Sequence, residues 1–574
     1  MIVLFLIPFL AILPLLSAGY FTHHDIQHPV RLFLLKQGWE QGYWFPRWVG
    51  DLGFGFGYPL FNFYPPLIYY VAGFFSLFGV SIIGSLKLML LTGFLLGALA
   101  SYLYGRLIFS QRTSLVVAAL FTYTFYHAIT VYIRGAFAEF FSYSLFPFVA
   151  FFLHGLIIRP SIKKIIGLAI SFALLILCHP LIAFPSLIFI AAYFLLAFVL
   201  SKNWIMSWLK MAAGLLLGLG LSAFFWLPSL IEKQLTLVDD ILTKELFSYR
   251  LHFVEVKQLF YSPWGFGGSV SGVEDGISFQ LGRYYWLFLL LSFLSFIWLF
   301  LKKKNSLKKP LLIIFIFNFS LLFLSYFMSL SWSRIFWDKI KYLWYLQFPW
   351  RFFTFGSFYL SLVAAAIFEL VPKLFKSAAL KKGSETLLII LTVILVVKYS
   401  QLFKPQVVYQ TTDQKLTNLN QRQWVISRTS FEFVPKGIAT KKNEFGVTTL
   451  AIDKKDLPKA SYQLLKGQAK VTQLENRFSH KTYLINAKSP ISFRLNTYNF
   501  AGWQAFLNDQ EIKINDQNKL KLITVSLPKG KATLRFIFKN TLVRTIGNWL
   551  SLISVGLVVI SMVVSLKKKR QTHS

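Results

Sequence analysis

Asp25 lies where the first long apolar stretch of the sequence ends, and a segment rich in aromatic residues, Gly and Pro follows it to about Pro66. A carboxylate at the end of a membrane span is costly to place there unless the protein uses it. We therefore expect chemistry at the bilayer surface, with an acid group facing a molecule that is carried in lipid. The alternative is that Asp25 caps a helix beginning near Pro29.

Histidines flank this carboxylate. His24 and His28 are one helical turn apart, a spacing that permits metal binding. Solvated histidines at a membrane interface are the more frequent case, so these two are weak candidates for a metal site. A divalent metal ion is left open as a cofactor. Cys178 is the single cysteine, which excludes an intramolecular disulfide and a cysteine-based metal cluster.

Further polar residues lie near the ends of apolar runs, where we expect them to face the same compartment as Asp25. Some have simpler explanations: Arg134 and Glu139 could pair with each other, His179 could cap a helix, and Arg351 could extend to lipid headgroups. Their convergence on one side nevertheless exceeds what helix anchoring requires. The set is Arg47, Asp51, Arg134, Glu139, His179, Asp275, Gln280, Arg283 and Arg351.

The composition is that of a polytopic membrane protein. The 574 residues are 56% hydrophobic and 14% charged, with a mean hydropathy of +0.57. A net charge of +36 would point to nucleic acid in a soluble protein. Here much of that charge lies in short clusters between apolar runs, as the positive-inside rule produces, so a nucleic-acid partner is excluded.

Twelve apolar runs are long enough to be candidate spans. They lie near 2–20, 85–108, 113–131, 140–158, 164–180, 182–200, 210–229, 284–301, 310–330, 352–371, 386–399 and 547–566.

With twelve spans and a cytoplasmic N-terminus, the basic clusters all fall on the cytoplasmic side. They are 106–112, 159–164, 202–210, 302–309, 373–382 and 567–570. A further span at 65–80 would reverse the later clusters, so we expect a juxtamembrane or re-entrant helix there.

This topology predicts three regions. Residues 1–399 form a multi-span membrane domain, with juxtamembrane helices at about 28–82. Residues 400–546 form an external β-rich domain, because apolar and polar residues alternate from 466 to 540 with turn signals between them, as in the antiparallel strands of a small sandwich. Residues 547–574 form a last span and a basic cytoplasmic tail. We expect a plasma-membrane protein with both termini cytoplasmic and its active face outside.

Six short segments, taken in order, carry a resemblance that covers nearly the whole chain. They are HHDIQHP, FPRW with GFGYPLFNFYPPL, RGAFAEF, YSPWG with SFQLG, QFPWRF and NFAGW. The chain resembles GT-C superfamily integral-membrane glycosyltransferases, and especially the bacterial membrane proteins labelled "6-pyruvoyl-tetrahydropterin synthase-related". The soluble pterin synthases are compact zinc enzymes, which this sequence does not resemble, so the label does not indicate the activity.

The resemblance implies a sugar donor linked to polyprenyl phosphate that reacts on the outer face of the membrane. Asp25 matches the family's base, which takes the proton of the acceptor hydroxyl as that hydroxyl attacks the anomeric carbon with inversion. Glu139 matches a second carboxylate that orients the acceptor or binds a metal. The metal-dependent members carry a pair of acids there, and this chain has one.

The leaving phosphate requires cations around it, and Arg134, His179, Arg351 and Arg283 are the candidates. Contacts to the acceptor or sugar are assigned to Trp39, Arg47, Asp51, Asp275 and Gln280. The acceptor class is open between glycan, lipid and protein, and membrane lipids are further partners.

The sequence is also compatible with two other functions: a flippase or transporter for lipid-linked glycans, and a non-catalytic protein of envelope glycan assembly. A transporter would carry ionisable groups at mid-span and broken helices in paired halves, whereas these charges lie at the external ends of spans. In the β-rich domain, Trp503 and Tyr498 are candidates for binding the acceptor or a growing glycan, and the alternative is that Trp503 belongs to the core of the sandwich.

Overall fold

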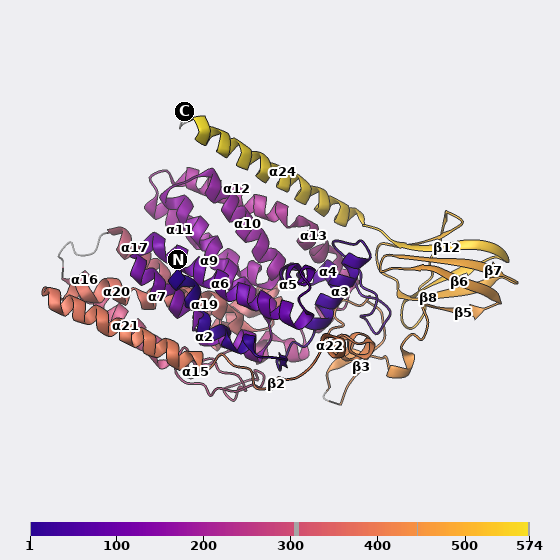
Figure 1. The fold of residues 1–574 in the computed structure, drawn as a ribbon, viewed down its shortest axis with the longest axis horizontal. Coiled ribbons are helices and arrows are strands. Elements are labelled where there is room, and N and C mark those ends of the chain that lie inside the picture. The colour runs from indigo at the N-terminus through magenta and orange to yellow at the C-terminus, as the bar shows by residue number, and fades with distance from the viewer. Residues whose placement is uncertain (1, 303–308, 445, 572–574) are drawn as a thin grey trace.

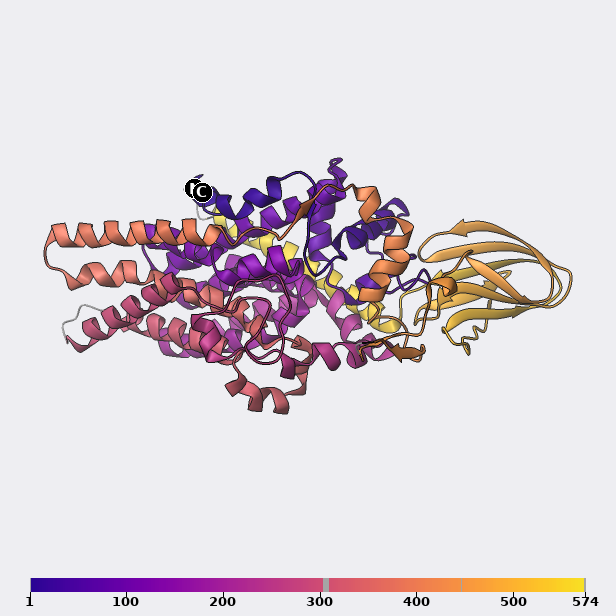
Figure 2. The same cartoon turned by 90° about the horizontal axis from the view of Figure 1, so that it is seen from below.

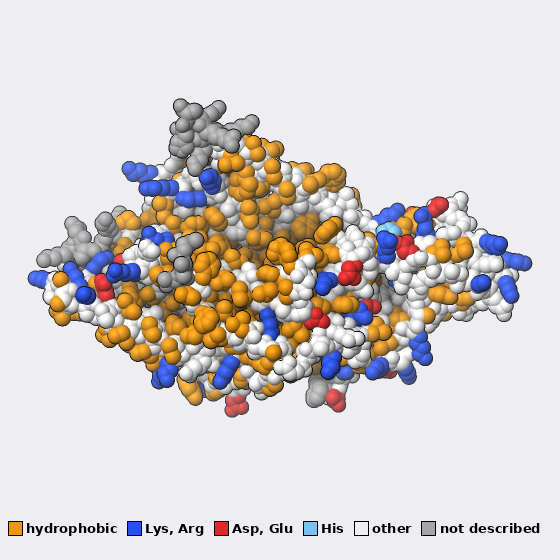
Figure 3. Space-filling model, in the orientation of Figure 1, with side chains coloured by type: hydrophobic (Ala, Val, Ile, Leu, Met, Phe, Trp, Pro, Cys, Tyr) orange, Lys and Arg blue, Asp and Glu red, His pale blue; other side chains and the backbone are white. Residues whose placement is uncertain are grey.

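The computed structural model describes residues 2–302, 309–444 and 446–571, and Figure 1 shows a helical body with a group of β-strands at one end. The view from below in Figure 2 shows the same two-part arrangement. On the face drawn in Figure 3, hydrophobic side chains dominate the middle of the helical body, and Lys and Arg are most frequent at the two ends and along the lower edge. This distribution is that of a protein with its apolar belt in a bilayer.

Eight helices within the described residues are long and apolar enough to cross a membrane, or up to nine if one bent pair counts as a span. They are α6 (Ile82–Ile108), α9 (Phe137–Ile158), α11 (Pro180–Leu200), α12 (Trp204–Leu221), α16 (Arg283–Leu301), α17 (Lys309–Phe327), the run of η8 (Pro349–Phe352), α19 (Phe353–Ala365), α20 (Ile367–Leu370) and η9 (Val371–Leu374), and α24 (Leu542–Gln571).

The twelve expected spans are therefore not confirmed. The first run, 2–20, is divided into α1 (Ile2–Leu6), α2 (Phe9–Ile12) and η1 (Leu13–Leu16), with Pro8 and Pro14 at the divisions, because proline cannot continue the hydrogen-bond ladder of a helix. The run at 164–180 forms α10 (Ile162–Cys178), which has 17 residues. The run at 386–399 lies in α21 (Ala378–Ser400), which is not one of the eight.

Two other expected spans are bent or broken. The run at 113–131 becomes α7 (Gln111–Thr122) followed by α8 (Phe125–Ala128) and the π-helix η2 (Ile129–Ile133), with a 45° bend between them. The run at 210–229 is divided between α12 and α13 (Ala223–Glu232). Most of the basic cluster at 302–309, and residues 572–574 of the predicted tail, lie outside the described residues.

Short helices connect these elements. Between 28 and 82, where juxtamembrane helices are expected, the structure has α3 (His28–Glu40), α4 (Leu60–Phe63) and α5 (Leu67–Leu77). The others are η3 (Lys233–Leu235), α14 (Val238–Ile241), η4 (Glu245–Phe247), η5 (Tyr249–Leu251), α15 (Val256–Phe260), η6 (Ser331–Ser333), α18 (Arg334–Lys339), η7 (Lys341–Leu346), α22 (Asp413–Leu416), η10 (Gln421–Ile426), α23 (Ser427–Thr429) and η11 (Lys454–Asp456).

The antiparallel strands expected in the C-terminal region are present. A five-stranded sheet has the order β10-β9-β12-β7-β6, and a three-stranded sheet has the order β11-β8-β5. Tyr483 and Phe536 of the first sheet contact Phe493 of the second, so aromatic side chains fill the space between the sheets. The strands are β5 (Tyr462–Lys466), β6 (Ala469–Asn476), β7 (His480–Ala487), β8 (Ile491–Tyr498), β9 (Trp503–Leu507), β10 (Gln510–Ile512), β11 (Leu522–Leu527) and β12 (Gly530–Phe538).

Two small ladders lie outside these sheets, and one of them joins distant parts of the chain. β1 (Tyr20–Phe21) pairs with β2 (Val408–Tyr409), which joins the segment before Asp25 to the segment after α21. β3 (Thr440–Lys442) pairs with β4 (Thr448–Leu450). The first ladder fixes where the loop carrying Asp25 begins.

Candidate active site

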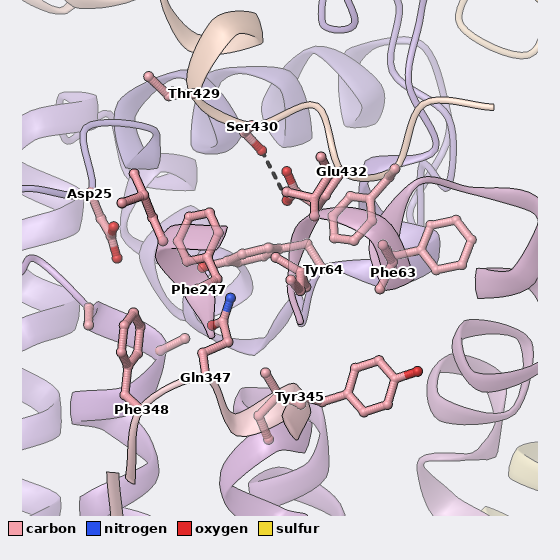
Figure 4. Close-up of a pocket in the computed structure, with 18 of the residues that line it drawn as sticks. Asp25, Phe63, Tyr64, Phe247, Tyr345, Gln347, Phe348, Thr429, Ser430 and Glu432 are labelled. Carbon is pink, nitrogen blue, oxygen red and sulfur yellow. Dashed lines mark hydrogen bonds between the residues drawn. The ribbon is translucent and has the colours of Figure 1, made fainter. Parts of the chain in front are cut away.

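A cavity of about 2020 Å³ extends between the helical body and the segments 424–433, 441–443 and 447–453. We call it the central cavity, and Figure 4 shows part of its lining. One wall is apolar and comes from α10 to α13; its residues include Phe172, Ile176, Leu181, Phe184, Leu187, Leu215, Leu219, Trp226 and Leu230. Phe184, Leu187 and Leu230 in this wall are exposed rather than packed against other side chains.

A buried ion pair network forms the polar end of the central cavity. Glu139, in the first turn of α9, makes salt bridges with Arg134 at 3.0 Å and with Arg351 at 3.2 Å. The hydroxyl of Tyr126 donates a third hydrogen bond to the same carboxylate. Because two guanidinium groups share one carboxylate, the network of Arg134, Glu139 and Arg351 by itself carries one net positive charge.

Both arginines are held in place by groups beyond the carboxylate. The guanidinium of Arg134 lies 4.4 Å from the ring centre of Trp350. Arg351 donates to the carbonyl oxygen of Leu346 at 2.8 Å and to the side-chain oxygen of Gln347 at 3.3 Å. Fixed guanidinium groups of this kind bind phosphate oxygens without much loss of side-chain freedom.

The loop carrying Arg134 also holds Asp25. The amide of Asp25 donates to the carbonyl oxygen of Arg134 at 2.9 Å, and the amide of His24 donates to that of Ile133 at 3.0 Å. Gly135 follows with φ +65°, and a side chain there would meet the ring of His23 at 2.3 Å. Only glycine therefore allows the two loops to approach this closely.

The carboxylate of Asp25 lines the central cavity and, within the described ranges, makes no hydrogen bond or salt bridge. Burial raises the pKa of Asp25 above its usual value, while the charges of Arg134, Arg31 and Arg351 act in the opposite direction. A carboxylate that is desolvated and unpaired is a stronger base than one in water.

A second carboxylate, Glu432, lies in the same cavity and was not among the residues selected from the sequence. The hydroxyl of Ser430 donates to it at 3.2 Å, and Arg31 donates to that hydroxyl at 2.9 Å. Burial raises the pKa of Glu432. The guanidinium of Arg31 also covers the ring of Tyr64 at 3.7 Å. In the sequence these two residues were only weakly marked: Arg31 is one arginine in an apolar helix, and Glu432 is one acid in an aromatic segment.

Six of the residues selected from the sequence meet in the central cavity. They are His24, Asp25, Arg134, Glu139, His179 and Arg351. His179 lies between α10 and α11, and its Nδ1 atom is buried without a hydrogen-bond partner among the described residues.

The other selected residues do not line this cavity. Arg47 donates to Asn62 and Asn548, and Asp51 makes a 2.8 Å salt bridge with Arg422. Trp39 donates to the carbonyl of Trp44, and Gln280 donates to the carbonyl of Ser262. Asp275 accepts hydrogen bonds from Gln258 and from the amide of Val270. The guanidinium of Arg283 lies over the ring of Tyr284.

Trp503 and Tyr498 are both buried. Trp503 contacts the rings of Trp48 and Phe538, and Tyr498 contacts that of Phe56. Of the two alternatives drawn from the sequence, these residues belong to the core.

The donor set for a metal ion is poor at this site. Both ring nitrogens of His28 are engaged, with the hydroxyl of Tyr69 and the carbonyl of Gly135, and a ring nitrogen of His24 contacts the carbonyl of Phe266. Glu139 is held by two arginines. No group of three or more His, Cys, Asp or Glu side chains in the described part of the chain could hold a metal ion, so we derive no step through one.

In chemical terms, the central cavity combines an unpaired base, a positively charged wall and a long apolar surface. The base can take a proton, the arginines can stabilise an anion that develops across the cavity, and the apolar wall can hold a hydrocarbon chain.

Comparison with known proteins gives one family match. The model of a family described as "6-pyruvoyl-tetrahydropterin synthase related domain; membrane protein" matches residues 61–405. No curated protein matches the sequence.

Two solved structures have a limited similarity to this chain. The apo crystal structure of the oligosaccharyltransferase of Archaeoglobus fulgidus is 12% identical, with 71% of this chain and 56% of that chain covered and a TM-score of 0.39. The archaeal oligosaccharyltransferase AglB from Archaeoglobus fulgidus, in complex with an inhibitory peptide and a dolichol-phosphate, is 12% identical, with 70% and 56% covered and a TM-score of 0.37. The chain spans little more than half the length of either, and similarity at this level establishes neither its fold nor its function.

Proposed function

The chain belongs to the 6-pyruvoyl-tetrahydropterin synthase related family of membrane proteins, and we propose that it is a glycosyltransferase of the GT-C type. In this proposal it moves a sugar from a polyprenyl-phosphate donor to an acceptor hydroxyl at the outer face of the plasma membrane. The observation that carries the proposal is the unpaired carboxylate of Asp25 in a cavity whose wall also holds Arg134 and Arg351.

The arginine pair supplies the site for the donor phosphate. Glu139 neutralises one of the two guanidinium charges, so a phosphate entering the cavity meets a positive wall rather than a balanced salt bridge. The phosphate gains negative charge as it leaves the sugar, and cations fixed beforehand stabilise that charge without reorganising. Glu139 acts here by positioning the arginines, and His179 is a further donor to the phosphate.

The apolar wall from α10 to α13 accounts for a lipid-linked donor. Each methylene that a polyprenyl chain removes from water contributes about 0.8 kcal/mol, and the wall is continuous with the polar end in one cavity. A soluble nucleotide sugar would gain nothing from such a surface.

Asp25 is the general base. Its carboxylate takes the proton of the acceptor hydroxyl while the hydroxyl oxygen forms a bond to the anomeric carbon. The bond between that carbon and the phosphate oxygen breaks, and the phosphate leaves with the electron pair. The raised pKa of Asp25 makes the carboxylate a better proton acceptor.

The active face and the 400–546 region lie outside the cytoplasm in this proposal, with both termini inside. This orientation is supported by the basic clusters between the apolar runs, which the positive-inside rule places on the cytoplasmic side.

Asp25→Asn tests the proposal. Membranes with the wild-type chain should transfer sugar from the lipid fraction to an acceptor, and the variant should lose about a hundredfold or more of that rate. Asp516→Asn is the matched control, because this acid pairs with Lys521 in the β-rich region and does not line the central cavity. Mass spectrometry of the lipid that co-purifies should find a polyprenyl phosphate carrying a sugar in wild type and both variants. Undiminished transfer by Asp25→Asn would remove Asp25 from the mechanism. A flippase or an assembly protein would carry out no transfer in any form.

A further inference from the structure

Four side chains from four separate segments line one part of the central cavity, beside Asp25. They are Tyr64, Phe247, Gln347 and Glu432. In Figure 4 the amide of Gln347 points toward the space around Phe247 and Tyr64, and Glu432 lies on the other side of that space. The mechanism described above uses none of them.

Gln347 has an uncommon backbone conformation. Its φ is +63° and its ψ −45°, and the amide of Phe348 donates across it to the carbonyl of Leu346 at 2.5 Å. This is a classic γ-turn, which is rare and strained for a residue with a side chain. Strain of this kind persists where the surrounding structure enforces it, and it is frequent at binding sites.

The surroundings also fix which end of the Gln347 side-chain amide faces the cavity. Arg351 donates to its oxygen at 3.3 Å, and the side chain is 6% exposed. With the oxygen occupied, the amide presents its nitrogen as a donor to the cavity. The γ-turn therefore holds a directed hydrogen-bond donor close to the phosphate-binding arginines.

Glu432 supplies acceptors at the same place. A carboxylate has room for about four hydrogen bonds, and part of that capacity is used by the hydroxyls of Ser430 and Tyr58 and by the backbone of Glu432 itself. The charge of Arg31 acts on Glu432 through space, and among the described residues this acid makes no salt bridge. A partly desolvated carboxylate with free lone pairs gains most from a ligand that donates hydroxyl hydrogens.

Two rings complete this part of the cavity. Phe247 is 37% exposed, and Tyr64 is held by the guanidinium of Arg31 over its ring. A sugar ring has apolar C–H faces and an edge of hydroxyl groups, so it suits aromatic surfaces combined with amide and carboxylate groups. An acceptor with a single hydroxyl group, such as a lipid alcohol, would leave most of these polar groups unpaired.

We infer that these four residues form a carbohydrate subsite, which binds the acceptor and makes a glycan the acceptor class of this protein. Tyr64 and Phe247 contact the apolar faces of the sugar, Gln347 donates to a hydroxyl oxygen, and Glu432 accepts from hydroxyl groups. This inference rests on the proposed function for the direction of transfer, but the binding that it predicts is measurable without transfer.

The test uses the full chain in lipid nanodiscs with four neutral probes: maltotriose, cellotriose, chitotriose and mannotriose. Saturation-transfer-difference NMR identifies the probe that binds, and titration gives its Kd. Glu432→Gln should raise that Kd by about tenfold to a hundredfold, since a hydrogen bond to a charged group is lost. Gln347→Ala should act in the same direction. Glu475→Gln is the matched control, because this glutamate lies on β6, pairs with Arg477 and does not line the cavity.

Two results would overturn the subsite: no binding of any of the four probes, or the same Kd for wild type and Glu432→Gln. Mass spectrometry of the co-purified lipid separates this failure from that of the proposed function. If a lipid-linked sugar is present and the probes do not bind, the subsite alone is wrong. If the probes bind at Glu432 and no lipid phosphate co-purifies, the donor assignment is wrong and the subsite stands.

Discussion

Replacing Glu139 by Gln removes the carboxylate that Arg134 and Arg351 share. At salt-bridge distances of 3.0 and 3.2 Å, each pair has a Coulomb energy of about 5 kcal/mol at an effective dielectric constant of about 20. Much of this energy offsets the desolvation of the charges. Removing one partner of a buried pair costs about 3–5 kcal/mol, because the remaining charges stay buried without compensation. We therefore expect a clearly lower midpoint of thermal unfolding for Glu139→Gln.

A lipid phosphate should reverse part of this loss. The substitution leaves two uncompensated guanidinium groups in the cavity wall, so an anion binds there more tightly than in the wild type. A ligand at a hundred times its Kd stabilises the folded state by about 2.7 kcal/mol. The assay is thermal unfolding of the detergent-solubilised full chain, followed by tryptophan fluorescence, with and without a polyprenyl phosphate.

Glu232→Gln is the control for this experiment. Glu232 is also buried, and it forms a salt bridge at 2.8 Å with Arg544, but it does not line the central cavity. Its loss should destabilise the protein without increasing the response to lipid phosphate. Wild-type stability for Glu139→Gln, or an equal lipid response of the two variants, would refute the assignment of the arginine pair to phosphate.

Two more predictions concern the loop that carries the base. Gly135→Ala should lower the stability of the fold by more than about 1 kcal/mol, because of the positive φ and the contact with His23. Gly383→Ala, in open space on α21, should raise the stability by about 0.5–1 kcal/mol. Thermal unfolding measures both variants, and equal effects would contradict the close approach of the two loops. The pKa of Asp25 is raised in the folded state, so its ionised form costs stability, and that cost develops as the pH rises from the usual carboxyl range through the raised pKa. Asp25→Asn lacks this cost, and its stability advantage over the wild type should grow across that window; parallel pH profiles would be the contrary result. The general base must be ionised to accept a proton, so the transfer rate should fall as the pH drops through the pKa of Asp25.

The sequence picked out six residues of the central cavity, while the other selected residues lie elsewhere. Asp25, Arg134, Glu139, His179 and Arg351 stand out because ionisable groups beside apolar runs are costly and therefore rare. The spans were less predictable, since a run of apolar residues specifies a buried segment and not an unbroken helix. Proline and local bending decided where the helices ended.

Glu432 could not be selected from the sequence. It is one acid among several in the 400–546 segment, and its place in the cavity depends on the β1–β2 ladder and on the contact of Ser430 with Arg31. These pairings join residues separated by almost 400 positions in the chain. No local pattern records a contact of that range.

The sequence by itself determined that this is a membrane protein with a β-rich C-terminal region, because hydropathy and the alternation of apolar and polar residues are local properties. It also determined which few side chains were unusual for their surroundings. The tertiary structure alone decided that Glu139 lies between two arginines, that Asp25 is left unpaired, and that Gln347 and Glu432 face the same space. Charge balance in a cavity depends on which groups meet there, and only the packing of distant segments fixes that.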